Sequence, residues 1–299
     1  MKKNIQLKKR KIEHDEIAKN YAVPDGSGRR DSSLLTRKRQ QSLAMGLSTK
    51  CETQVGSRPD RIESHTYYPS SVEKGEPLRQ SVLIFYDTTV KEVGGEKTTL
   101  DKYNGVQEMP NALIIPLPKK AKAKKGDVVL TWWQSGSGMQ RAIVVDDSNP
   151  QEPKVCYFDL TWPDNPESPK LEEKRKGEPL KPGSFAVLKD GQWQSGAQLA
   201  IKKGNDWLKG TLIHVDGDKV LVLGFGSKIE AYNKADVRLV PFKEKIKVGD
   251  KVWASWVSEY RPGYVVTAVD DLTGHVYVQR DGKGSVESKS LADVTKILE

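Results

Sequence analysis

Short apolar runs alternate with turn-forming residues along the second half of the chain. The final stretch, residues 248–299, shows this most clearly, because runs rich in Val, Tyr and Trp are separated by turns that contain Gly and Asp. Such runs, bounded by turn residues every roughly 8–12 positions, are typical of small antiparallel barrels. The pattern therefore predicts a compact β-barrel at the C-terminal end.

The same plan recurs twice upstream. The motif Gly-Asp-x-Val begins at Gly126 and again at Gly249, and in each case a tryptophan follows seven residues after the glycine (Trp133 and Trp256). A less regular copy opens at Gly183. Repetition at about 60 residues indicates an array of similar domains, since solenoid repeats are shorter.

These patterns predict an all-β protein of three consecutive small antiparallel barrels, preceded by a tail and a short β segment. Two apolar runs, 81–86 and 112–115, account for the β segment. The expected organisation is a disordered basic tail over residues 1–75, a β segment with a charged linker over 76–120, a first barrel with a Pro-rich loop over 121–182, a second over 183–245 and a third over 246–299.

The net charge of +9 is concentrated in the tail. Residues 1–50 carry 13 Lys and Arg against 5 Asp and Glu, so the rest of the chain is nearly neutral. The tail also lacks the apolar periodicity that a packed core needs, which predicts disorder. Two clusters give it a candidate polyanion-binding surface, with a merely solvated tail as the alternative: Lys8, Lys9, Arg10 and Lys11, and Arg37, Lys38 and Arg39.

Two features bear on the cellular compartment. The two cysteines, Cys51 and Cys156, form no disulfide framework and have no zinc-ligand spacing. The chain has no apolar run of about 20 residues, as a membrane helix requires, and no apolar stretch follows its basic start. The default expectation is a cytoplasmic or nuclear protein, and the alternative is an envelope lipoprotein acylated at Cys51.

Taken together, Gly-Asp-x-Val, the following tryptophan, a Gly-x-Gly-Ser turn and a final Leu-x-Asp-Val resemble the Tudor family of SH3-like barrels over residues 248–296. Membership would imply a five-stranded, strongly bent barrel that binds partners and performs no chemistry. Many Tudor domains bind methylated lysine or arginine in an aromatic cage, and others bind nucleic acid or act as spacers.

The resemblance places the cage of the last repeat at Trp256 and Tyr264, with Arg280 and Lys283 at the two remaining positions. A cage binds a methylated cation through the faces of its rings, and positive charges there oppose binding. We therefore expect this repeat not to bind methylated peptides. Arg280 and Lys283 instead join the basic tail as candidate polyanion contacts.

The other repeats offer partial cages. In the second repeat, Phe225 matches one aromatic position. In the first repeat, Arg141 occupies the position on the second strand, although rings and an anion lie nearby. The candidate ligand-binding residues of the first repeat are Trp133, Phe158, Asp159 and Trp162.

Features of an enzyme are missing from the sequence. The histidines His14, His65, His214 and His275 are scattered, and the last two lie beside hairpin turns, where surface positions are expected. The paired aspartates at 146–147 and 270–271 follow strands, which favours turn formation. We therefore expect no catalytic residues, no metal and no cofactor.

The resulting hypothesis is a non-enzymatic binding or scaffold protein that engages a protein, peptide or polyanionic partner. Three alternatives stay open: a nucleic-acid-binding protein that uses the basic tail and the basic residues of the barrels, a bacterial envelope lipoprotein-type module, and a spacer.

If the tail binds nucleic acid, replacing Lys8, Lys9, Arg10 and Lys11 by Ala should reduce the salt dependence of binding. Four lost phosphate contacts lower the slope of log K against log salt by about 3–4 for duplex DNA. Titrations at several salt concentrations measure this slope, and an unchanged slope would assign binding to the barrels.

Overall fold

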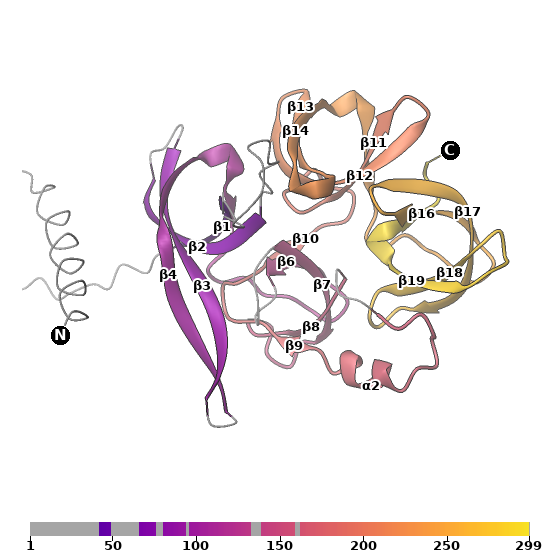
Figure 1. Ribbon diagram of the computed structural model, residues 1–299, viewed down its shortest axis with the longest axis horizontal. Coiled ribbons are helices and arrows are strands. Elements are labelled where there is room, and N and C mark those ends of the chain that lie inside the picture. Colours follow the sequence, from indigo (N-terminus) through magenta and orange to yellow (C-terminus); the bar gives the residue numbers. More distant parts are fainter. Residues whose placement is uncertain are drawn as a thin grey trace, which may run out of the picture. The chain divides into compact units, whose positions relative to one another are not determined.

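A computed structural model describes residues 42–48, 66–75, 80–93, 96–132, 139–158 and 162–298, with side chains from Pro110 onward except at Ser227. All of these residues belong to one compact unit, Gln41–Glu299. The predicted all-β class is confirmed, since the described residues form twenty strands with antiparallel pairing and one short α-helix (Figure 1). None of the described helices is long and apolar enough to cross a membrane. The predicted basic clusters at residues 8–11 and 37–39 lie outside the described residues.

The first five strands form one sheet in the order β4-β3-β2-β1-β5, called strand group 1. They are β1 (Ser42–Ser48), β2 (Thr66–Gly75), β3 (Gln80–Val93), β4 (Glu96–Pro110) and β5 (Ile115–Pro116). β1 and β2 fall inside the range 1–75 that was expected to be disordered, so that expectation is wrong for these two segments. They supply the pairing partners that the two predicted strands of the β segment lacked.

Strand group 2 is a second sheet with the order β10-β6-β7-β8-β9. Its strands are β6 (Val128–Trp132), β7 (Met139–Asp146), β8 (Lys154–Tyr157), β9 (Glu178–Pro179) and β10 (Ala186–Leu188). The helix α2 (Lys170–Arg175) lies between β8 and β9 in the chain. β10 pairs with β6, so the strand pairing crosses the domain boundary expected at residue 183.

The remaining ten strands form one sheet that contains two further groups. Strand group 3 comprises β11 (Gln198–Lys203), β12 (Asp206–Asp216), β13 (Lys219–Leu223), β14 (Ile229–Asn233) and β15 (Val237–Val240). Strand group 4 comprises β16 (Lys251–Trp256), β17 (Glu259–Asp270), β18 (His275–Arg280), β19 (Val286–Ser290) and β20 (Val294–Thr295). Pairing of Trp207 with Tyr260 joins β12 to β17 and so connects the two groups.

All four groups have the same strand order. In each, the fifth strand pairs with the first, and the first four strands pair in sequence. In groups 1, 3 and 4 a single 3-10 turn precedes the fifth strand: η1 (Asn111–Leu113), η3 (Lys234–Asp236) and η4 (Leu291–Asp293). A fourth group with this order, formed by the strands upstream of residue 117, was not expected.

The Gly-Asp motif forms a turn that starts the first strand of groups 2 and 4. Gly126 and Gly249 adopt left-handed φ angles of +84° and +89°, a conformation that glycine reaches without steric cost. Each glycine N–H donates to a carbonyl of the second strand, at 2.8 and 2.9 Å. The side chains of Asp127 and Asp250 accept the N–H of the residue three positions earlier.

The equivalent turn of group 3 lies at Gly196 and not at Gly183. Gly196 has a φ of +91°, and its N–H donates to the carbonyl of Leu212 on the second strand at 2.8 Å. Ala197 stands where the other two turns have aspartate. Without this carboxylate the motif is hidden in the sequence, which explains the misplaced start of the second repeat.

Groups 2, 3 and 4 each enclose a small apolar interior. Tyr157 and Phe185 lie in that of group 2, Leu199 and Val222 in that of group 3, and Tyr264 in that of group 4. Burial of a large apolar side chain stabilises the fold by about 1.5–3 kcal/mol, so each interior contributes substantially.

Two further apolar clusters lie between the groups. The larger combines side chains of groups 2, 3 and 4, among them Leu130, Ile213 and Tyr277, with Ile115 of group 1. The smaller combines Trp207 of group 3 with Tyr260 and other residues of group 4. The groups are therefore packed against one another through these apolar clusters and are not joined by linkers alone.

A buried series of hydrogen bonds between side chains crosses the contacts between groups 2, 3 and 4. The guanidinium of Arg141 on β7 donates to the side-chain carbonyl of Gln198 on β11. The Gln198 amide donates to the Tyr260 hydroxyl at 3.0 Å, and this hydroxyl donates to the carbonyl of Ala292 at 3.1 Å. Arg141, Gln198 and Tyr260 are all buried. Arg141 of group 2, Gln198 of group 3 and Tyr260 of group 4 are therefore linked by hydrogen bonds between their side chains.

Close approach between groups predicts the effect of one substitution. A Cβ at Gly274, in group 4, would lie 2.6 Å from the ring of Phe158, in group 2. Gly274→Ala should therefore lower the free energy of unfolding by about 1–3 kcal/mol for the overpacked contact, beyond about 1 kcal/mol for the left-handed backbone. Denaturant titration measures the difference.

Gly282→Ala is the matched control for this prediction. Gly282 has nearly the same φ, +64° against +68°, but nothing lies within 4 Å of an added Cβ. Equal losses of stability in the two variants would contradict tight packing between groups 2 and 4.

Candidate ligand-binding site

A groove of about 390 Å³ lies where groups 2, 3 and 4 meet, and we call it the junction groove. Group 2 and the segment after it contribute two aromatic rings and a carboxylate, group 3 contributes Lys209, and group 4 contributes the remaining wall. Its lining comprises Phe158, Trp162, Asp164, Lys209, Ser255, Val257, His275, Ser288, Lys289, Ser290 and Asp293. The groove therefore exists only because the groups pack together.

Trp162 packs against two other side chains beside the groove. Its ring lies 3.9 Å from that of His275 between centroids, and the Lys174 ammonium lies over the indole, 5.3 Å from its centroid. The indole N–H donates to the carbonyl of Tyr157 at 3.0 Å. Phe158 meets His275 edge to face at 6.1 Å. Contacts within the chain thus fix the ring of Trp162.

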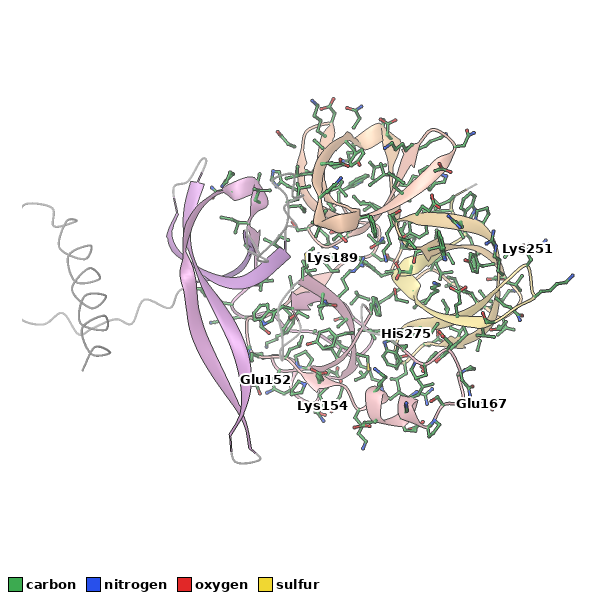
Figure 2. The ribbon with its side chains drawn as sticks, in the orientation of Figure 1. Glu152, Lys154, Glu167, Lys189, Lys251 and His275 are labelled. Atoms are coloured by element: carbon green, nitrogen blue, oxygen red, sulfur yellow. The ribbon has the colours of Figure 1, made fainter. Side chains whose placement is uncertain are left out.

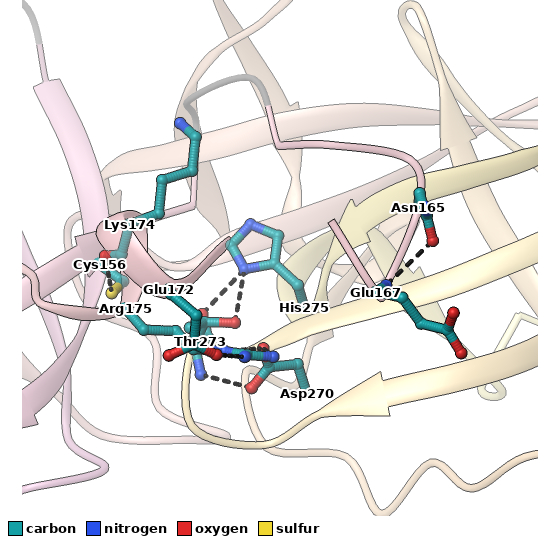
Figure 3. A network of polar contacts seen from close by, with 9 residues as sticks. All are labelled: Cys156, Asn165, Glu167, Glu172, Lys174, Arg175, Asp270, Thr273 and His275. Atoms are coloured by element: carbon teal, nitrogen blue, oxygen red, sulfur yellow. Dashed lines mark hydrogen bonds and ion pairs between the residues drawn. The ribbon is translucent and has the colours of Figure 1, made fainter. Parts of the chain in front are cut away.

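His275 is the most unusual polar residue of the groove, because only 1% of it is exposed. In Figure 2 it lies where group 4 faces group 2, whereas Lys251 lies on the outer side of group 4. Its Nδ1 is 3.0 Å from the carbonyl of Thr273, so this nitrogen carries the proton and donates (Figure 3). Nε2 is then a lone-pair acceptor, and it has no hydrogen-bond partner among the described residues.

Burial keeps His275 neutral. Desolvation lowers its pKa from 6.5 to about 4, against the opposing influence of the Thr273 carbonyl and of Asp270 and Asp293. The nearby Lys174 ammonium adds to the lowering. At neutral pH the groove therefore presents an uncharged imidazole with an open acceptor.

The charged groups of the groove already have partners. Lys209 forms an ion pair with Asp293 at 2.5 Å, and Ser290 donates to the same carboxylate at 3.1 Å. Burial raises the pKa of Asp293, but Lys209 and the nearby Arg141 outweigh it and keep the pKa below 3.8. Asp164 accepts the backbone N–H of Ser288 at 2.8 Å. The groove is therefore polar, with its charges compensated by neighbours.

The rim of the groove includes a strained backbone. Val257, at the turn between β16 and β17, has a φ of +57°, a conformation that branched side chains adopt at a cost of about 1–3 kcal/mol. It is 61% exposed, and its neighbour Trp256 is 44% exposed with the Arg261 guanidinium 3.7 Å from its ring. Strain of this kind is often found at functional sites. The exposed apolar turn at Val257 forms part of the groove lining.

The helix α2 is fixed beside the groove. Arg175 donates twice to the carboxylate of Asp270, at 3.1 and 2.9 Å, which ties α2 to group 4 (Figure 3). Cys156 contacts the carbonyl of Lys174 at 3.2 Å, and burial raises the pKa of its thiol to about 12. The thiol is therefore protonated, and it acts as a small apolar group.

The paired aspartates form turns, as predicted. Asp146 accepts the N–H and the hydroxyl of Ser148, which lowers its pKa to about 2. Asp270 accepts the N–H of Thr273 at 3.3 Å. Within the described part of the chain, no three His, Cys, Asp or Glu side chains are placed to hold a metal ion.

The predicted cage residues are mostly separated. Trp162 and Phe158 do meet in the junction groove, but both are buried, and Trp133 and Asp159 lie outside the described residues. Phe225, in the turn η2 (Phe225–Ser227), is 66% exposed.

In group 4 the two proposed cage rings lie apart. Tyr264 is buried in the interior of the group, opposite Val252, whereas Trp256 is exposed and pairs with Glu259 at the end of the hairpin. Arg280 and Lys283 are exposed around the turn after β18. These positions do not form a common aromatic surface.

Sequence reasoning missed the role of His275. His214 is exposed as expected, but the surface position expected for His275 is wrong. His275 begins a strand within the run His-Val-Tyr-Val, whose residues are all buried because one side faces the interior of group 4 and the other faces group 2. The uninterrupted apolar run after His275 was the available signal in the sequence, because such runs are typical of strands that are buried on both faces.

Comparison with protein-family models finds no family that matches the chain, and no curated protein matches it.

The lowered pKa of His275 predicts a loss of stability in weak acid. The unfolded chain binds a proton near pH 6.5, whereas the folded chain binds it only near pH 4. Stability from this residue is therefore complete above pH 6.5 and falls by about 3 kcal/mol as the pH approaches 4. Denaturant titrations between pH 7 and 4 measure this slope.

His275→Gln should flatten the slope, whatever its effect on stability at pH 7. His214→Gln, at an exposed position, should leave the slope unchanged. A slope that persists without His275 would show that other groups cause it, since the aspartates with lowered pKa values act below pH 4.

Proposed function

We propose that this protein is a non-enzymatic binding or scaffold protein, built from tandem SH3-like, Tudor-like barrels, that engages a protein or peptide. The repeated order of five antiparallel strands supports this proposal, as do the 3-10 turns before the last strand. Four small modules with one strand order provide a scaffold whose function lies in the surfaces between them.

The observation that carries the proposal is the junction groove. Two apolar clusters and the Arg141–Gln198–Tyr260 chain hold three groups around it. A preformed groove costs little ordering entropy on binding, so weak contacts suffice for useful affinity. The exposed pair Trp256 and Val257 extends this surface beyond the groove, and aromatic side chains are frequent binding anchors.

The same residues offer little for catalysis. His275 has a Thr273 carbonyl as its orienting partner, and its ring packs against Trp162. Ser290 donates to the Asp293 carboxylate at 3.1 Å, but this carboxylate is already paired with Lys209. These contacts favour a binding role over an activated nucleophile.

Val257→Asn should separate binding from folding. Asparagine tolerates a left-handed backbone better than valine, so stability should stay constant or rise by up to about 1 kcal/mol. Loss of the apolar rim should weaken partner binding by about tenfold. Affinity capture from the source cells, quantified by mass spectrometry and compared with denaturant titration, measures both effects.

Val248→Asn is the matched control, because Val248 is 64% exposed, has a negative φ and does not line the groove. Partners that both variants retain equally would show that the groove is not the binding surface. Partners that nuclease removes would assign the interaction to nucleic acid.

A further inference from the structure

Three buried polar atoms of the groove lining accept or donate no hydrogen bond among the described residues, and one of them, Oδ1 of Asp293, is in the ion pair with Lys209. The other two, Nε2 of His275 and the hydroxyl oxygen of Ser288, have no partner there. An unsatisfied buried polar atom costs about 1–3 kcal/mol, so a fold seldom keeps two beside one groove without a reason. Both residues line the groove. The hydrogen-bonding capacity of these two atoms therefore indicates which groups a ligand must supply.

The chemistry of the two atoms is specific. Because Nδ1 of His275 donates to Thr273, Nε2 can only accept, and the ligand must supply an N–H or O–H donor. The Ser288 hydroxyl can donate, so it suits a carbonyl oxygen. A planar group that carries one donor and one acceptor has the chemistry that the two atoms require.

The charges of the groove disfavour ions. An anion would meet the lone pair of His275 and the carboxylates of Asp164 and Asp293. A cation would meet Lys209 and Lys289, while Asp293 is already neutralised by Lys209. An uncharged ligand avoids both penalties and leaves the existing ion pairs intact.

We infer that the junction groove recognises an uncharged amide group of the bound partner. Its N–H donates to Nε2 of His275, and its carbonyl accepts from the hydroxyl of Ser288. This inference rests on the proposed binding function and specifies its chemistry. The amide belongs either to the main chain of a peptide or to an Asn or Gln side chain.

Small probes test this recognition directly on the full chain. N-methylacetamide represents the main chain and acetamide the side chain, methyl acetate has the shape of N-methylacetamide without its donor, and acetate has the shape of acetamide with a negative charge. With so few atoms, each probe binds at millimolar concentration or weaker. Chemical-shift titrations of the labelled protein follow the resonances of Trp162 and His275.

An amide probe should shift these resonances saturably, and methyl acetate and acetate should bind at least about tenfold more weakly. The better of the two amides identifies the source of the group. Ser288→Ala should weaken the amide about tenfold, whereas Ser285→Ala, on the exposed turn, should not. His275→Phe, if it folds, should abolish the preference for the amide over the ester.

Equal binding of methyl acetate, stronger binding of acetate, or no saturable shift with any probe would overturn the inference. The last result would mean that ordered water satisfies the two atoms. These outcomes are independent of the Val257→Asn experiment. Loss of partner binding in that variant, without a preference for the amide probes, would support the binding function and reject amide recognition. A preference for the amide probes with unaltered partner binding would support amide recognition and reject the proposed binding function.

Discussion

The buried chain from Arg141 through Gln198 to Tyr260 is the interaction on which the arrangement of groups 2, 3 and 4 depends. A guanidinium removed from water is costly unless its donors are satisfied and its charge is compensated. Gln198 and the negative charge of Asp293 provide this only if strands of three groups lie in register. Apolar contacts hold the groups together, and the polar chain selects one arrangement among those that would bury similar area.

The same constraint shapes the groove. Asp293 acts on Arg141 from group 2 and Lys209 from group 3, so one carboxylate of group 4 balances cations of both neighbours. The charged side chains of the groove wall thus have partners within the fold, and selectivity rests on hydrogen-bond direction and shape. Aromatic residues contribute mainly to packing, with Trp162 in contact with both Lys174 and His275. Of the described rings, Trp256 and Phe225 stay exposed, one at the end of β16 and the other in the turn η2.

Local patterns allowed much of the fold to be predicted, because turns and strands are local. The Gly-Asp turns at Gly126 and Gly249 start strands as expected, and the all-β class follows from the alternation of short runs. The turn at Gly196 escaped because Ala197 lacks the carboxylate. The sheet of group 1 escaped because β1 and β2 are separated by a long segment, and pairing between distant strands leaves no periodic signal.

The groove could not be predicted, since it depends on which outer faces of the groups meet. Nothing local distinguishes Tyr264, which fills an interior, from Trp256, which is exposed eight residues earlier on the same hairpin.

The contacts between groups have a consequence for how the protein opens. Group 2 meets group 3 and group 4, and these two share a paired strand, so the contacts form a closed ring without end members. In a linear repeat array, terminal members fray first and stability is a sum over neighbours. Here no group can detach without breaking two contacts at once, so we expect the three to open as a single cooperative unit, with cleavage of their described residues starting at the exposed hairpin tips.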